Sequence, residues 1–264
     1  WVYYPWNNHL IHILDEEEFA RVRTSRNKYK ITGAEQALLS TKKVGVIGLS
    51  VGQSVSVCMA MERSFGELRI ADFDSLDLSN LNRIHTGIQH LGLPKTIITA
   101  REILSHDPFL KVTLFHEGIT HENIDAFFSE GGVLDAVVDE CDSVDIKILC
   151  RMKASQYRVP LVMEMSDRCM VDVERYDKDP NLPMFQGGIE VPDLKQLSAL
   201  TNEQKIPYML PMVGASTISA RLKASATEVG SSISTWPQLA SAVVMGGGVT
   251  ADVVRRILLD APIE

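Results

Sequence analysis

The chain has 264 residues, of which 45% are hydrophobic and 23% charged, and it carries a formal net charge of −8. This length and composition are typical of a globular protein with a sizeable core. The negative charge argues against nonspecific nucleic-acid binding, because no general positive field attracts phosphate. The four cysteines form no CxxC pair, which argues against structural zinc, and the absence of a secretory signal at the start predicts a cytoplasmic protein.

Residues 1–43 form the first predicted part, an arm and a helix ahead of the main domain. The acidic run Asp15–Glu18 and the basic residues after it have the pattern of a solvated helix face. Those basic residues are Arg21, Arg23, Arg26, Lys28 and Lys30. The chain begins at Trp1 without an initiator methionine, so we expect it to be a piece of a longer protein.

Residues 44–176 alternate strands with helices. Strands are predicted at Val44–Gly48, Glu67–Ala71, Lys111–Phe115, Leu134–Asp139 and Pro160–Met165. Helices are predicted at Gly52–Ser64, from Pro94 to about Ser105, from a cap at Thr120 to the Gly131–Gly132 pair, and at Val144–Gln156. Most of these strands are near-continuous apolar runs, as buried parallel strands are. The pattern predicts an α/β fold with a Rossmann-like, doubly wound, mostly parallel sheet and helices on both faces.

Residues 177–264 are predicted to be a connecting loop and a helical C-terminal part of the same domain. Prolines and the pair Gly187–Gly188 indicate the loop, and apolar spacing predicts a last helix at Val249–Leu259. The uncharged stretch 229–251 is long enough to span a bilayer. Its serines, glycines and Pro237 instead favour a protein that does not enter a membrane.

The turn Gly48–Gly52 between the first strand and its helix has three interpretations. As Gly-x-Ser-x-Gly it could be a nucleophile elbow with Ser50 as the attacking hydroxyl. As a degenerate glycine-rich turn it could hold phosphate at Gly48, Ser50 and Gly52. It could also be a tight turn that simply needs glycine. The histidines that follow it all precede Leu134, too early for an elbow's acid-then-histidine order, and this favours the phosphate turn.

An acid- and amide-rich loop follows the second strand, 24 residues after Gly48. Asp72 and Asp74 come first, and Asn80, Asn82 and Arg83 come after them. This spacing is close to the one that nucleotide-binding folds use for their ribose contact. Carboxylates can hold ribose hydroxyls or magnesium, and a guanidinium can bind phosphate through two hydrogen bonds.

Three motifs in order carry a resemblance to a known family. They are the segment Leu68–Arg83, the run Gly92-Leu-Pro-Lys95 and the run Asp139-Glu-Cys-Asp-Ser143. From about Arg23 to Tyr176 the chain resembles the ubiquitin-activating-enzyme-like superfamily, with the ThiF, MoeB and HesA adenylyltransferases as its bacterial relatives. The family forms an acyl-adenylate, in which a carboxylate attacks the α-phosphate of ATP and pyrophosphate leaves.

The resemblance implies a role for each matching residue. Asp72 would bind ribose, Asp74 would support the metal or the loop, and Asp142 would coordinate magnesium. Asn80, Arg83 and Lys95 would hold the phosphates. Two of these residues have simpler alternatives, because Lys95 could be a solvated first-turn lysine and Asp142 a helix cap.

The resemblance also implies partners. An arginine at the position of Arg26 reaches across a homodimer to the partner's triphosphate, so we expect a homodimer with a shared site. The activated carboxylate could belong to a protein or peptide C-terminus, such as a small ubiquitin-like or sulfur-carrier protein. The opening Trp1–Leu14, Asp172–Tyr176 and the tail are similar to ThiF-like domains joined to a nitroreductase-like domain, which implies such a fusion.

The sequence departs from the family pattern in its glycine turn and in its cysteines. The turn lacks two of the usual glycines, so Ser50 and Val51 could narrow or reshape the phosphate loop. No cysteine follows Tyr176, where thioester-forming relatives carry their nucleophile. Cys58 and Cys150 are expected to be core residues. Cys141 is expected to have a raised pKa because acids flank it, and Cys169 is placed in a strand-like segment. Adenylation without a catalytic cysteine is therefore the prediction.

Two other functions remain open at this point. A nicotinamide-dependent oxidoreductase would use Asp72 equally well for the ribose of NAD, although it would not need Arg83, Lys95 and Asp142 together. A binding module with a decayed site, kept for dimerisation or for positioning a fused domain, is the second.

Overall fold

The computed structural model describes residues 1–188, 197, 200, 202–212, 214, 218–233 and 235–263. A six-stranded sheet forms the centre, with β3 (Lys43–Ile47), β4 (Glu67–Ala71), β5 (Lys111–Phe115), β6 (Ala136–Asp139), β7 (Leu161–Glu164) and β8 (Val171–Glu174) in the order β5-β4-β3-β6-β7-β8. All neighbours pair in parallel except β7 and β8. The predicted Rossmann-like architecture is confirmed.

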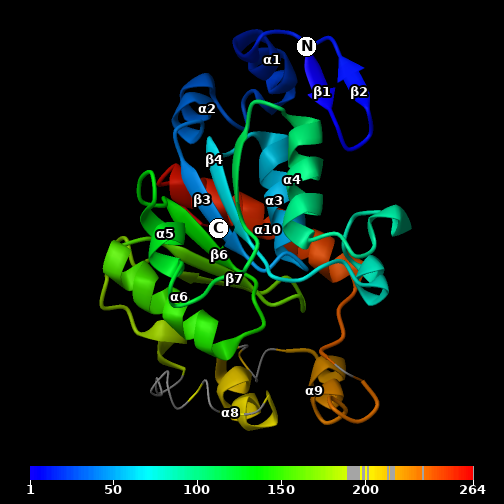
Figure 1. Cartoon of the computed structure of the whole chain (residues 1–264). Helices are drawn as coiled ribbons and strands as arrows, with labels where there is room; N and C mark the ends of the chain where they lie inside the picture. The colour runs from blue at the N-terminus through cyan, green and yellow to red at the C-terminus, as the bar shows by residue number, and fades with distance from the viewer. Residues whose placement is uncertain are drawn as a thin grey trace.

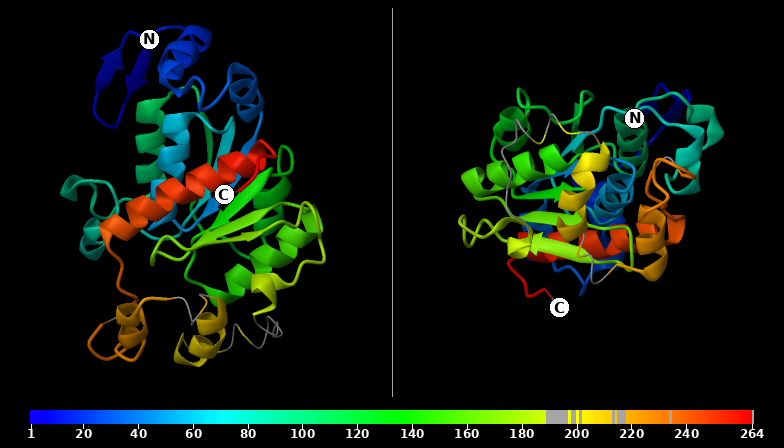
Figure 2. Two further views of the ribbon diagram at one scale, coloured as in Figure 1. Left: turned by 180° about the vertical axis from the view of Figure 1, so that it is seen from behind. Right: turned by 90° about the horizontal axis from the view of Figure 1, so that it is seen from below.

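Helices cover both faces of this sheet (Figures 1 and 2). On one face lie α3 (Gly52–Glu62), α4 (Lys95–His106) and the long α10 (Ala240–Leu258), and on the other lie α5 (Ile124–Ser129) and α6 (Val144–Tyr157). Side chains alternate between two cores, as strand geometry requires: Val44 and Val46 pack with α3 and α10, whereas Ile47 packs with α5 and α6.

The amino-terminal part is a hairpin followed by short helices at the amino ends of the strands (Figure 1). The hairpin pairs β1 (Val2–Tyr4) with β2 (His9–Ile11), and it was not predicted. Then come α1 (Glu16–Arg23), a 3₁₀ turn at Ser25–Asn27 and α2 (Gly33–Leu39). Asp15 caps α1, and a reciprocal Thr32–Glu35 capping box begins α2.

The carboxyl-terminal part contains α8 (Asn202–Met212) and α9 (Ala220–Ala226), which lie beyond the carboxyl ends of the strands, before α10 returns to the sheet (Figure 1). The predicted connecting loop falls partly outside the described residues. In the described part of the chain, no helix is both long and apolar enough to cross a bilayer.

Several predicted boundaries were wrong. The last helix begins at Ala240 instead of Val249, because Gly246 and Gly247 let it pack closely on Glu164 and Ser54. Cys169 lies in the turn between β7 and β8, where its φ of 54° is incompatible with a strand. Thr120 does not cap α5 directly; its hydroxyl accepts from the backbone N–H of Glu122 and Asn123 one turn earlier.

Candidate active site

A cavity of about 380 Å³ opens at the carboxyl edge of the sheet. It lies between β3 and β6, where the strand order reverses, which is the usual ligand position in open α/β sheets. Six of the predicted residues line it, namely Gly48, Ser50, Asp72, Asp74, Lys95 and Asp142. The opposite wall comes from the carboxyl-terminal part, with Lys205 and Met209 of α8 and Val229, Thr235 and Trp236 after it.

Gly48 is required by geometry at the end of β3. Its φ is +85°, and a Cβ atom there would lie 2.5 Å from the carbonyl oxygen of Glu140. Both constraints exclude other residues, whatever the turn binds. Ser50 and Leu49 follow without glycine, and the turn remains open to the cavity.

Asp72 braces the glycine turn from the end of β4. One carboxylate oxygen accepts the backbone N–H of Leu49 at 2.6 Å, and the other accepts that of Asp74 at 2.8 Å. Burial raises the pKa of Asp72, although the Lys95 ammonium and the two N–H donors oppose that rise. A carboxylate can accept about four hydrogen bonds, so Asp72 retains capacity for a ligand.

Lys95 is not a solvated lysine, because its side chain is 6% exposed and its Nζ lies 2.7 Å from an Asp74 oxygen. The same Nζ lies 3.4 Å from Ser50 Oγ. Arg83 approaches that hydroxyl from the other side, at 3.3 Å. Two cations therefore converge on one serine in the glycine turn.

Arg83 is the less neutralised of the two cations. Its guanidinium donates to oxygen atoms of Ser79, Asn82 and Ser50, and no carboxylate among the described residues forms an ion pair with it. Its buried Nε has no hydrogen-bond partner in the described structure. Burial lowers the pKa of Arg83 and the nearby Asp142 carboxylate opposes this, but a guanidinium stays charged at neutral pH. Such a cation favours an anionic ligand.

Asp142 is an exposed carboxylate on the cavity wall, at the loop between β6 and α6. Ser143, not Asp142, occupies the cap position of α6. No cluster of three metal-ligating side chains occurs among the described residues. Magnesium binds nucleotide sites through one or two carboxylates together with substrate phosphates, and Asp142 fits that requirement.

Four predicted residues are not part of the cavity wall, and one of them, Arg83, contacts it through Ser50 Oγ at 3.3 Å. Gly52 begins α3, where a Cβ atom would meet Val46 Cγ1 at 2.6 Å. Asn80 closes a capping box with Asp77 in the acid-rich loop. Arg26 is exposed near the carboxyl end of α3, since the adjacent Asn27 donates to Glu62 O at 3.0 Å. The 11 residues of α3 separate it from the cavity by about 16 Å.

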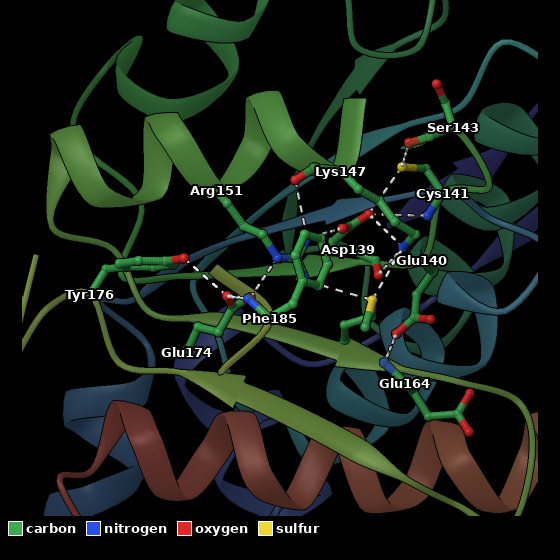
Figure 3. Close-up of polar contacts among 11 residues, drawn as sticks. Asp139, Glu140, Cys141, Ser143, Lys147, Arg151, Glu164, Glu174, Tyr176 and Phe185 are labelled. Atoms are coloured by element: carbon green, nitrogen blue, oxygen red, sulfur yellow. Dashed lines mark hydrogen bonds and ion pairs between the residues drawn. The ribbon is translucent and has the colours of Figure 1, made fainter. Parts of the chain in front are cut away.

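A buried charge cluster beneath the cavity was missed by the sequence analysis (Figure 3). Arg151 of α6 lies 2.8 Å from Asp139 and 2.6 Å from Glu174, with all three side chains fully buried. Lys147 adds a second cation 3.3 Å from Asp139. Burial raises the pKa of Asp139, but these cations outweigh it and the net shift is downward. Only their i, i+4 spacing on α6 offers a signal in the sequence.

Glu140 and Glu164 form a second unexpected feature beside this cluster (Figure 3). An oxygen of Glu140 accepts the backbone N–H of Glu164 at 3.1 Å, and Glu164 Oε1 is buried with no hydrogen-bond partner in the described structure. Burial raises the pKa of Glu140 well above its usual value, and the Glu164 carboxylate adds to this.

The pKa of each of the four cysteines is raised, because burial outweighs the cations near Cys58, Cys141 and Cys150. Cys150 is buried and Cys58 half-buried, as expected of packing residues. The pKa of Cys141 is raised as predicted, but the cause is burial and Asp139, whereas Glu140 and Asp142 were expected. Burial and Glu164 also raise the pKa of Cys169.

A family model described as the ThiF family matches residues 24–244. The chain belongs to the ThiF family. An uncharacterized protein of Mycobacterium tuberculosis (strain CDC 1551 / Oshkosh), MT1398, is 43% identical over all 264 residues, and the chain spans 36% of its length. A Bacillus subtilis (strain 168) relative, tRNA threonylcarbamoyladenosine dehydratase, is 28% identical over 154 residues, which are 58% of this chain and 59% of the relative.

Solved structures of the ThiF family share the fold. The Escherichia coli tRNA N6-threonylcarbamoyladenosine dehydratase TcdA, in complex with AMP, superimposes with a TM-score of 0.64. The match covers 94% of this chain and 98% of that one at 20% identity, so it establishes the architecture alone.

Proposed function

We propose that this ThiF-family chain is an ATP-dependent adenylyltransferase that activates a carboxylate as an acyl-adenylate and releases pyrophosphate. The observation that carries the proposal is the convergence of Arg83 and Lys95 on Ser50 Oγ, at 3.3 and 3.4 Å. The guanidinium of Arg83 also has no carboxylate partner among the described residues. This arrangement suits a triphosphate better than it suits a neutral ligand.

The residue roles follow from position. Asp72 holds the ribose, while the turn at Gly48 and Ser50 faces the phosphates together with Arg83 and Lys95. Asp74 orients Lys95 through their 2.7 Å ion pair. Asn80 and Gly52 act on the loop and the helix behind the turn, where they keep Arg83 and Ser50 in place. Asp142 holds Mg²⁺, which supplies further neutralisation of phosphate charge when bound.

The reaction needs no side-chain nucleophile. An oxygen of the substrate carboxylate forms a bond to the α-phosphorus, and the bond from that phosphorus to the bridging oxygen breaks. The electron pair of that bond leaves with pyrophosphate. Arg83 and Lys95 stabilise the negative charge that develops on the leaving group. Such electrostatic stabilisation is usually the largest single contribution to the rate of an enzymatic reaction.

The substrate carboxylate is proposed to be a protein or peptide C-terminus, including that of a small ubiquitin-like or sulfur-carrier protein. One relative is named for tRNA threonylcarbamoyladenosine, so a modified RNA is the natural competitor. The net charge of −8 gives no general attraction for RNA and favours the peptide. A cytoplasmic location and a fused nitroreductase-like domain accompany this proposal.

The proposal includes a homodimer in which Arg26 serves the partner's cavity, since it lies about one helix length from its own. Mixing inactive Arg26→Ala protein with inactive Asp142→Ala protein should restore partial activity, because one hybrid site then keeps both residues. An active protein that sediments as a monomer would contradict the shared site.

The decisive test is ATP–pyrophosphate exchange with a panel of peptides, small carboxylic acids and RNA carrying threonylcarbamoyladenosine. We expect exchange that depends on a peptide carboxylate and that is lost in Asp142→Ala. Exchange that occurs with the RNA and with none of the peptides would show that the substrate is the modified RNA instead of a peptide. Hydride transfer from NADH, or no chemistry at all with intact folding, would favour the oxidoreductase or the binding module.

A further inference from the structure

The cavity wall that faces the sheet edge differs in chemistry from the nucleotide side. Lys205 projects from α8, with its Nζ 3.1 Å from an Asp145 oxygen and its side chain 15% exposed. Met209 follows it by one helical turn, and Val229 and Trp236 line the same wall. The wall therefore combines one ammonium group, three apolar side chains and the hydroxyl of Thr235.

Lys205 is held in place but not consumed by its ion pair. Ser143 donates to the same Asp145 oxygen at 2.8 Å, which fixes the carboxylate that positions Lys205. An ammonium has three donors, and the bond to Asp145 uses one of them. The other two can serve a ligand in the cavity.

The charge of the cavity makes a second cation necessary for a carboxylate substrate. Asp72, Asp74, Glu140 and Asp142 all line it, and an approaching carboxylate is repelled by those that are ionised. Lys95 lies at the glycine turn, where the proposed function assigns it to the phosphates. Among the described lining residues, Lys205 is the other lysine, and it comes from α8 in the wall that the carboxyl-terminal part forms.

We propose that Lys205 binds the substrate carboxylate and that Met209, Val229 and Trp236 hold an apolar or aromatic group beside it. This inference rests on the proposed adenylyltransferase function and narrows its substrate class. The substrate is a chain that ends in an apolar or aromatic residue, because a terminal glycine would leave Trp236 and Met209 without contact. Lys205 is a positioning residue that brings the carboxylate oxygen towards the α-phosphorus.

The test uses the exchange assay on the full chain with short acetylated peptides that differ only in the last residue, Phe, Leu or Gly. Lys205→Met should raise the KM for the peptide by about 10- to 100-fold, as loss of a charged hydrogen bond does, and leave the KM for ATP within about twofold. Lys205→Arg should recover most of the loss. Lys223→Met, on the exposed face of α9, is the matched control.

Trp236→Ala should remove the preference for Phe over Gly without changing the KM for ATP. If the Lys205–Asp145 pair is purely structural, Lys205→Met should lower the melting temperature and leave the KM for peptide and the KM for ATP unchanged. That result would overturn the inference. A wild-type preference for the Gly peptide would also overturn it. If wild-type protein shows no exchange with any carboxylate, the adenylyltransferase proposal fails and the inference fails with it.

Discussion

Two groups of charged side chains, the buried cluster around Arg151 and the pair Lys95 and Arg83 at Ser50, differ in whether the fold itself neutralises their charge. In the buried cluster, Arg151 is matched by two carboxylates at 2.8 and 2.6 Å, and no side chain is exposed. Beside the glycine turn, Arg83 has no carboxylate partner in the described structure. The first group completes itself within the fold, whereas the second requires an anion from outside.

This difference separates charges that stabilise the fold from charges that can bind a ligand. Phe185 covers Arg151, with its ring centroid 3.7 Å from the guanidinium carbon, and closes the buried cluster to solvent. Lys95 and Arg83 instead meet at a serine that lines the cavity. Variants of the two groups should therefore change different properties.

The largest effect is expected from Arg151→Met, which leaves Asp139 and Glu174 buried without a cation. Loss of one partner of a buried ion pair costs about 3–5 kcal/mol, and chemical denaturation should show that decrease. Lys153→Met, two residues along α6, is the control. Its pair with the half-exposed Asp125 should cost less than about 1 kcal/mol. Equal losses of stability in Arg151→Met and Lys153→Met would show that the buried cluster contributes no more to stability than an exposed ion pair.

The second largest loss of stability is expected from Gly48→Ala, and Gly92→Ala is its matched control. Both glycines have positive φ, +85° and +82°, but only Gly48 lacks room for a Cβ atom. The left-handed conformation alone costs about 1–2 kcal/mol in alanine, and this should be the whole effect at Gly92. Gly48→Ala should cost more and should also weaken ATP binding in calorimetry. Equal losses of stability in the two variants would show that the close contact between residue 48 and the carbonyl oxygen of Glu140 does not exclude a Cβ atom.

Glu140→Gln is expected to raise stability at neutral pH, by a smaller amount. The folded pKa of Glu140 lies above that of the unfolded chain, because burial and then Glu164 favour the neutral form. The stability that the protonated Glu140 contributes to the fold is therefore fully present below about pH 4.3 and is lost as pH rises through the folded pKa. The advantage of glutamine should grow over that window by about 1.4 kcal/mol per pKa unit. Exposed Glu117→Gln should show no such growth in denaturation curves.

Cys169→Ala is expected to change nothing in catalysis. Burial and Glu164 raise the pKa of this thiol, so little thiolate exists to form a thioester. Exchange rates and any transfer to a downstream acceptor should match the wild type. A substrate–protein adduct that is sensitive to reductant and disappears in the variant would overturn the proposed cysteine-free mechanism.

The sequence predicted five of the six strands and most of the cavity edge, because strand ends and glycine turns have local patterns. It did not predict β8, which pairs antiparallel with β7 at the edge of the sheet. Gly48, Asp72 and Lys95 could be found since each lies at a strand or helix end. Lys205 and Trp236 could not, because they reach the cavity only through the path of the chain after Tyr176. Arg151 was missed for a related reason: its partners lie 12 residues before it and 23 after it in the sequence.

We expect the guanidinium of Arg83, which has no carboxylate partner among the described residues, to bind the phosphates of ATP. Thermal unfolding of wild-type, Arg83→Gln and control Arg21→Gln protein should be measured with MgATP, with NADH and without ligand. A ligand that binds only the folded state raises the melting temperature, by about 2–4 °C for each kcal/mol in a protein of about this size. We expect a rise with MgATP in the wild type and the control, a much smaller rise in Arg83→Gln, and none with NADH. Stabilisation by NADH, or an equal MgATP shift in Arg83→Gln, would contradict it.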